Sequence, residues 1–187
     1  FTTSNGQPIT MAPAVEKHPK GGYMIVFVTG KLFDSTDQKD TSTHYAYGIW
    51  DPYPSTAANN TNTALVTQTL TETTFNNTRL RTASNNAIDW DTSLGWKLAL
   101  PIGGERLLGG DGARISKKAG SASAGTGSSG SSVDAVWPFI FQTSNPTINP
   151  TSTWPSENWW MEIYYLTGGG TGKPRWDLNN DSKVDLT

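Results

Sequence analysis

The fold is decided first by residues 22–31, which read Gly-Tyr-Met-Ile-Val-Phe-Val-Thr-Gly-Lys. The residues Tyr23–Val28 are all large and apolar, and glycines stand on both sides of them. A short apolar run bounded by turn residues is typical of a strand that is buried on both faces. We therefore expect a strand here that other parts of the chain cover from both sides.

Further segments predict strands along the chain, and turn residues separate most of them. They are 44–50, 64–70, 78–82, 95–100, 105–108, 136–142 and 159–166. The third of these is polar and is expected at the surface, whereas Pro138 in the sixth favours an edge strand or a bulge. In the predicted strand 159–166, Trp159 and Trp160 point to opposite faces, so at most one of them is expected to be exposed.

Short strands separated by turns predict an all-β fold, which could be a sandwich, a barrel or a propeller. Residues 119–132 contain only Ala, Gly, Ser and Thr, which is the composition of a flexible insertion in a long loop. A propeller blade takes ~40–50 residues in known repeat families. The 187 residues would therefore supply about four blades at most, so a propeller would be small or incomplete.

Composition excludes several classes of protein. The net charge is only -2, which argues against a nucleic-acid binder driven by phosphate neutralisation. The absence of cysteine excludes a disulfide scaffold, a cysteine nucleophile and a thiolate zinc site. No apolar run approaches the ~20 residues that a transmembrane helix needs. Because the chain begins at Phe1, we expect a processed mature chain or a fragment, and its Thr, Ser, Asn and Gly content suits an extracellular β protein.

The strongest local motif is the sequence Asp-Leu-Asn-Asn-Asp-Ser-Lys-Val-Asp at residues 177–185. Its spacing matches a calcium loop of the EF-hand type, in which the seventh position contributes a backbone carbonyl. Calcium prefers six to eight hard oxygen ligands, and this loop offers three carboxylates and an amide oxygen. The predicted ligands are Asp177, Asn179, Asp181, the carbonyl of Lys183, and Asp185.

Two features of this loop depart from a complete EF-hand. Ser182 stands where a glycine normally makes the sharp turn, and the twelfth position lies beyond Thr187. Pro174 and several glycines precede the loop, so flanking helices are not expected. We predict a calcium loop without an EF-hand, and the alternative is an Asp/Asn-rich turn near the end of the chain.

Other candidate sites are better explained as ordinary structure. His18 and His44 do not have the spacing of metal ligands, and the glycines at 168–172 do not fit a phosphate-binding loop. The carboxylate pairs Glu157 with Glu162 and Asp89 with Asp91 could serve glycoside hydrolysis, but they are expected to be solvated residues. The eight Trp residues could form a sugar-stacking platform, although large aromatic side chains more often fill a β core.

An ordered set of phrases carries a resemblance to a known family. The phrases are Pro-Ile-Thr-Met-Ala-Pro at 8–13, Gly-Tyr-Met-Ile-Val-Phe-Val-Thr-Gly-Lys at 22–31, Asp-Ser-Thr-Asp at 34–37, Tyr-Gly-Ile-Trp-Asp at 47–51, Gly-Trp-Lys-Leu-Ala-Leu-Pro at 95–101, Gly-Glu-Arg at 104–106 and the Asp/Asn loop. From about Pro8 to Asp185, the chain resembles the C-terminal β-propeller region of the PilY/PilC family of type IV pilus biogenesis factors and tip adhesins.

The resemblance implies a fold and a role. It implies that residues 1–187 are one propeller-type region with an incomplete, C-terminal set of blades and long loops. Family members are secreted, act at the pilus tip and on the outer-membrane surface, and have minor pilins or tip subunits as partners. In some of them a calcium loop of this form regulates pilus extension and retraction.

We therefore expect a non-enzymatic, calcium-binding pilus assembly and adhesion factor, whose propeller another chain could complete. The main alternative is a carbohydrate-binding β module of a secreted enzyme system. A catalytic hydrolase domain is a third and weaker alternative.

Overall fold

The structure is a computed structural model, and it describes the chain in several ranges. These are residues 2–3, 6–52, 64–75, 77–108, 113–117, 137–146 and 157–171. The Gly/Ser/Ala segment 119–132 and the predicted calcium loop 177–185 lie outside the described residues.

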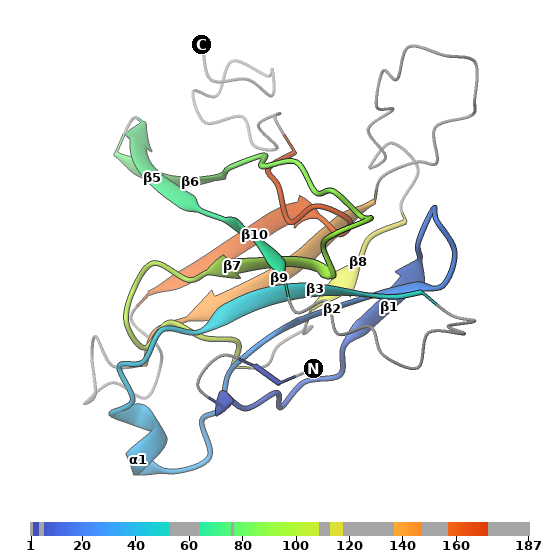
Figure 1. The fold of residues 1–187 in the computed structure, drawn as a ribbon. Helices are drawn as coiled ribbons and strands as arrows, with labels where there is room; N and C mark the ends of the chain where they lie inside the picture. Colours follow the sequence, from blue (N-terminus) through green and yellow to red (C-terminus); the bar gives the residue numbers. More distant parts are fainter. Residues whose placement is uncertain are drawn as a thin grey trace.

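The largest sheet has five strands in the order β1-β2-β3-β7-β4. The strands are β1 (Ala14–Lys17), β2 (Tyr23–Val28), β3 (Tyr45–Asp51), β4 (Leu65–Gln68) and β7 (Gly95–Ala99). Its pairs are antiparallel except for β4 and β7, which run parallel. The predicted strand at 23–28 is confirmed, and it lies inside this sheet between β1 and β3 (Figure 1).

Two smaller sheets complete the described fold. A three-stranded antiparallel sheet has the order β10-β9-β8, and an antiparallel hairpin joins β5 to β6. Their bounds are β5 (Leu70–Phe75), β6 (Thr78–Ala83), β8 (Arg114–Ile115), β9 (Pro138–Ser144) and β10 (Asn158–Tyr164). The single helix among the described residues is α1 (Ser35–Gln38). These open sheets fit an all-β fold with an incomplete set of propeller blades.

The core lies between the five-stranded and the three-stranded sheets. Alternate residues of β2, β3 and β7 pack against alternate residues of β9 and β10 in one cluster of buried side chains. Its strand members include Met24, Val26, Val28, Ala46, Trp96, Leu98, Phe139, Phe141, Trp159, Met161 and Ile163. The opposite face of the five-stranded sheet carries a second cluster around Phe27, Tyr47, Ile49 and Leu94. The prediction that 23–28 is buried on both faces is therefore confirmed, although Tyr23 itself is 45% exposed.

Trp96 is the largest of the fully buried side chains in the described part of the fold, and it requires two glycines beside it. Its Nε1 donates a hydrogen bond to the carbonyl of Tyr165 at 2.9 Å. A Cβ on Gly48 would lie 2.2 Å from that Nε1, and a Cβ on Gly168 would lie 2.4 Å from the indole ring. Side chains at these two positions would collide with the ring, so the glycines allow β3 and the turn after β10 to close on it.

The structure corrects several sequence-based expectations. Strand β9 is the central strand of its sheet rather than an edge. Pro138 is tolerated because it is the first residue of that strand. The predicted strand 64–70 breaks at Thr69, where the chain leaves the five-stranded sheet for the β5–β6 hairpin. The predicted strand 105–108 forms only an isolated bridge, between Arg106 and Ser144.

The strand 78–82 is confirmed as β6, but it is not fully exposed. The side chain of Arg81 in this strand is only 1% exposed. No helix in the described ranges is long and apolar enough to span a membrane.

Candidate functional site

The most elaborate polar site surrounds the loop that carries α1, at one end of the molecule (Figure 1). The Asp34 side chain caps the helix by accepting hydrogen bonds from the amides of Thr36 and Asp37 at 2.7 and 3.0 Å. The Asp37 carboxylate reaches back to the Asp34 amide, which completes a capping box. A helix of one turn is not stable alone, so the rest of the site must hold it in place.

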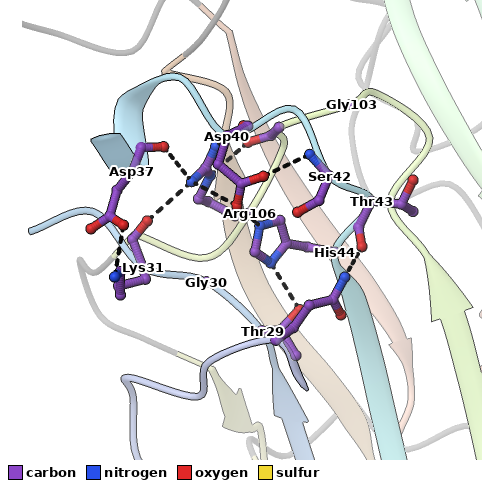
Figure 2. Close-up of polar contacts among 12 residues, drawn as sticks. Thr29, Gly30, Lys31, Asp37, Asp40, Ser42, Thr43, His44, Gly103 and Arg106 are labelled. Atoms are coloured by element: carbon purple, nitrogen blue, oxygen red, sulfur yellow. Dashed lines mark hydrogen bonds and ion pairs between the residues drawn. The ribbon is translucent and has the colours of Figure 1, made fainter. Parts of the chain in front are cut away.

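The buried side chain of Arg106 supplies that support (Figure 2). Its guanidinium donates hydrogen bonds to the carbonyls of Lys31 at 3.2 Å and Asp37 at 2.8 Å, and also to that of Asp40. Its Nε donates to the carbonyl of Gly104 at 2.7 Å. One buried cation thus binds four backbone carbonyls and ties residues before and after the first turn of α1 to the segment that follows β7. We call the segment 31–40 the clamped loop.

The charge of this arginine is balanced within the site. The Asp40 carboxylate lies 3.8 Å from Nη1 of Arg106 and 3.6 Å from Nε2 of His44. Burial lowers the pKa of Arg106, while Asp40 and Asp37 oppose this effect. Burial acts to raise the pKa of Asp40, but the hydrogen bonds from Ser42 and the charge of Arg106 lower it overall. The site therefore holds a paired buried charge rather than an isolated one.

One further contact lies within the clamped loop and another lies beside it. Lys31 Nζ lies 2.8 Å from Asp37 Oδ1, and this contact lowers the pKa of Asp37 and raises that of Lys31. His44 is buried and lies 3.1 Å from the Thr29 hydroxyl through Nδ1. Burial and the Arg106 charge lower the pKa of His44, although Asp40 acts in the opposite direction.

A second charged cluster joins the β5–β6 hairpin to the three-stranded sheet. Arg81 contacts Glu105 through two hydrogen bonds of 2.5 and 2.9 Å, and Glu105 has no exposed surface. The Thr143 hydroxyl donates to the same carboxylate. Arg81 also binds Glu72 at 2.8 Å and lies 3.6 Å above the Trp159 ring.

The site residues that the sequence predicts fall in a part of the chain that the structure does not describe. The calcium ligands Asp177, Asn179, Asp181, Lys183 and Asp185 lie outside the described residues. Within the described ranges, no group of three or more His, Asp or Glu side chains could hold a metal ion.

The expectation that the carboxylates of the two candidate hydrolysis pairs are solvated is confirmed for Asp91, which is 83% exposed, and is wrong for Glu157, which is 15% exposed because Arg79 covers it. Glu157 pairs with Arg79, and Asp91 lies 2.6 Å from Lys20. Asp89 accepts hydrogen bonds from Asp91 N and the Thr92 hydroxyl within one turn.

The tryptophans do not form an exposed row in the part of the chain that is described. Trp96 and Trp159 are buried, and Trp160 is 47% exposed on the other face of β10, as the alternation predicted. The remaining described tryptophans, Trp50, Trp90 and Trp137, are half-buried. This arrangement does not favour a sugar-stacking platform.

Sequence reasoning missed Arg106, Arg81 and Glu105 as buried charges. In the sequence, Glu105 and Arg106 belong to the predicted strand 105–108 and to a phrase of the family resemblance, and neither feature predicts that their charges are buried. A pointer was present, because Glu105 and Arg106 directly precede the apolar pair Leu107-Leu108 in a chain with only 16% charged residues.

His18 gives a testable pH dependence of stability. The ring is buried and stacks on Trp50 at 4.6 Å between centroids, and its Nδ1 accepts a hydrogen bond from the Lys20 amide. The proton of the neutral ring is therefore on Nε2. Burial, assisted by the charge of Lys20, lowers the pKa of His18 to about 4.

Since an unfolded histidine has a pKa of about 6.5, the unfolded chain binds more protons between pH 6.5 and 4. Stability from His18 is fully present above about pH 6.5 and should fall by about 2–3 kcal/mol as the pH approaches 4. Urea unfolding at pH 7.5 and 4.5 measures this loss, and His18→Gln should have a flatter profile than the wild type. Equal pH slopes for the two proteins would contradict the prediction.

Comparison with known proteins identifies the family. A family model described as the PilY1 beta-propeller domain matches residues 2–84, which include the whole clamped loop. The type IV pilus biogenesis factor PilY1 of Pseudomonas aeruginosa strain UCBPP-PA14 is 31% identical over 204 residues. PilY1 of P. aeruginosa strain PAK is 30% identical over 201 residues. Each alignment covers 96% of this chain and 16% of the relative, and no solved structure matches the chain significantly.

The chain thus spans about a sixth of the length of these relatives, and its similarity to them extends over nearly all of its own length. Its strand-rich fold with open sheets agrees with the propeller assignment. The chain belongs to the PilY1 family of type IV pilus biogenesis factors.

Proposed function

We propose that the chain is part of a non-enzymatic component of the type IV pilus machinery that contributes to pilus biogenesis and surface adhesion. The observation that carries this proposal is the 31% identity over 96% of the chain to a type IV pilus biogenesis factor. Its site of action would be extracellular, at the pilus tip and the outer-membrane surface. Its partners would be minor pilins or other tip subunits.

The described structure supports a scaffolding role over a catalytic one. The buried charges Arg81, Glu105 and Arg106 are used in contacts that tie separate parts of the fold together. The open sheets also leave strands that further sequence, or another chain, could cover to complete a propeller.

The proposed function can be tested directly in the organism that carries the gene. Deleting the gene should remove surface pili in electron micrographs and abolish twitching motility, and restoring the wild-type gene should recover both. A deletion strain with a normal number of pili would refute the proposed function.

We also propose that residues 177–185 bind calcium. Support comes from the chemistry of the donor set, because Asp177, Asn179, Asp181 and Asp185 provide hard oxygens at calcium-loop spacing, with the carbonyl of Lys183 as a further ligand. Extracellular calcium modules bind with dissociation constants of about 10⁻⁴–10⁻³ M, so a modest affinity is expected here.

Removal of calcium should destabilise the protein if this site is occupied. A ligand at a hundredfold excess over its dissociation constant stabilises the folded state by about 2.7 kcal/mol. Titration of calcium into the apoprotein should give heat, and a chelator should lower the melting temperature. In the double variant Asp177→Ala/Asp181→Ala, the heat should disappear and the chelator should have no effect. A wild-type protein that gives no heat would show that the loop does not bind calcium.

A further inference from the structure

We propose that Leu32 and Phe33, at the start of the clamped loop, form a preformed docking element for another protein of the pilus machinery. The partner would receive the Phe33 ring in an apolar pocket that is rimmed by a basic side chain. This inference rests on the proposed function and adds to it a contact surface and the chemistry of the partner.

The exposure of Phe33 is the first observation. It is 78% exposed, which makes it the most exposed of the large apolar side chains in the described part of the chain, and Leu32 beside it is 39% exposed. Ile9, 46% exposed, pairs through its backbone with Gly30, two residues before Leu32. Single exposed apolar residues are common, but two large ones next to each other in the chain, with a third that pairs two residues away, favour an interaction site.

The second observation is that the backbone under Phe33 is held in place. The Phe33 amide donates a hydrogen bond of 2.8 Å to Asp37 Oδ2, and Lys31 Nζ holds the other oxygen of that carboxylate. The Arg106 guanidinium binds the carbonyls of Lys31 and Asp37, on either side of the exposed pair (Figure 2). The exposed aromatic side chain is therefore carried by a fixed turn and not by a loose loop.

A fixed turn of this kind favours binding. An interface must offset the entropy of ordering its side chains and loops, and this cost falls when the element is ordered beforehand. Aromatic anchors that enter apolar pockets supply much of the energy of protein interfaces. Figure 1 shows α1 and its flanking turn projecting beyond the sheets, where a partner can approach them.

The charges near Phe33 define the rim of the partner's pocket. Asp34 follows Phe33 directly and is exposed; its carboxylate caps α1, and its charge acts on Lys31 without a direct ion pair between the two. Asp37 and Asp40 lie further along the same turn, and their nearest cations, Lys31 and Arg106, belong to the clamp. A lysine or arginine on the partner would complement the Asp34 carboxylate.

The test uses the full-length protein in the organism that encodes it. Phe33→Ser should reduce the number of surface pili by about tenfold or more, as expected for the loss of an interface anchor. Phe33→Leu should retain most of the pili. Asp34→Asn keeps the helix cap but removes the charge, so it should cause a smaller loss. Tyr23→Ser is the matched control, because Tyr23 is an aromatic residue that is 45% exposed on β2, an interior strand outside the clamped loop.

Two further measurements separate docking from folding. The melting temperature of purified Phe33→Ser should equal that of the wild type within about 2 °C, since surface substitutions change stability little. Phe33→Cys in the purified full-length protein should react with a maleimide as fast as Lys39→Cys does.

Several results would overturn the inference. Normal piliation with Phe33→Ser would show that the ring is not needed for docking. Normal piliation with Asp34→Asn would show that the partner's pocket has no basic side chain at its rim. A large fall in the melting temperature, or a Phe33→Cys that does not react, would show that the rest of the polypeptide already covers the ring. If deletion of the whole gene leaves pili intact, the proposed function fails and this inference fails with it.

Discussion

Replacing Arg106 with methionine should lower the free energy of unfolding by about 3–5 kcal/mol, close to the cost of breaking a buried ion pair. The guanidinium is completely buried and donates to the carbonyls of Gly104, Lys31, Asp37 and Asp40. Methionine fills much of the same volume but donates no hydrogen bond, so these carbonyls must find water or remain unpaired. A hydrogen bond to a charged group contributes about 1.5–3 kcal/mol to stability, and the contributions of several such bonds do not simply add up.

Urea unfolding of the purified protein measures this change, and hydrogen exchange shows where it acts. Amides of the clamped loop should lose protection before those of β2 and β3, because Arg106 connects the loop to the sheets. Arg106→Lys should be intermediate, since a lysine keeps the charge but lacks the fork of donors. Lys20→Met is the surface control, because the Lys20–Asp91 pair is exposed and should contribute less than about 1 kcal/mol. A loss below that value for Arg106→Met would show that the clamp is not a stabilising element.

The strands that the sequence predicted well are those whose pattern is local. The apolar run at 23–28 and the predicted strands 44–50 and 95–100 correspond to β2, β3 and β7, with ends that differ by no more than one residue. In β10, the alternation predicted that Trp159 and Trp160 point to opposite faces with at most one of them exposed, and the structure buries Trp159 and exposes Trp160. Side-chain direction in a strand repeats every two residues, so the sequence carries this information directly.

The order of the strands and the buried charges could not be predicted in the same way. Strand β4 lies parallel to β7, which follows it only after the β5–β6 hairpin, and nothing local in 65–68 indicates that pairing. Arg106 is buried because carbonyls from residues 31–40 surround it, and these lie more than 60 positions away in the chain. A charged side chain is normally expected at the surface, so burial of this kind becomes visible only when its distant partners are placed.

The Arg81–Glu105 pair makes the second large prediction. Glu105 is completely buried and Arg81 nearly so, and two hydrogen bonds join them. Glu105→Leu leaves a buried guanidinium with one remaining carboxylate partner, Glu72. We expect it to lower the free energy of unfolding by about 3 kcal/mol, at the lower end of the range for a broken buried pair. Arg81→Leu should cost about 3–5 kcal/mol, because among the described residues it leaves the Glu105 carboxylate with the Thr143 hydroxyl as its one side-chain partner.

The double variant Arg81→Leu/Glu105→Leu distinguishes a structural pair from two independent packing positions. With both charges removed, neither is left unpaired, and leucines can pack against the face of Trp159 that Arg81 now covers. Replacement of a whole buried pair by apolar residues is often neutral. The double variant should therefore lose less stability than the two single variants together, with an interaction energy of about 1–3 kcal/mol in the urea-unfolding cycle. Additive losses would mean that each side chain stabilises the fold through separate contacts. Coupling would instead show that Arg81 and Glu105 stabilise the fold as one ion pair between the β5–β6 hairpin and the segment that follows β7.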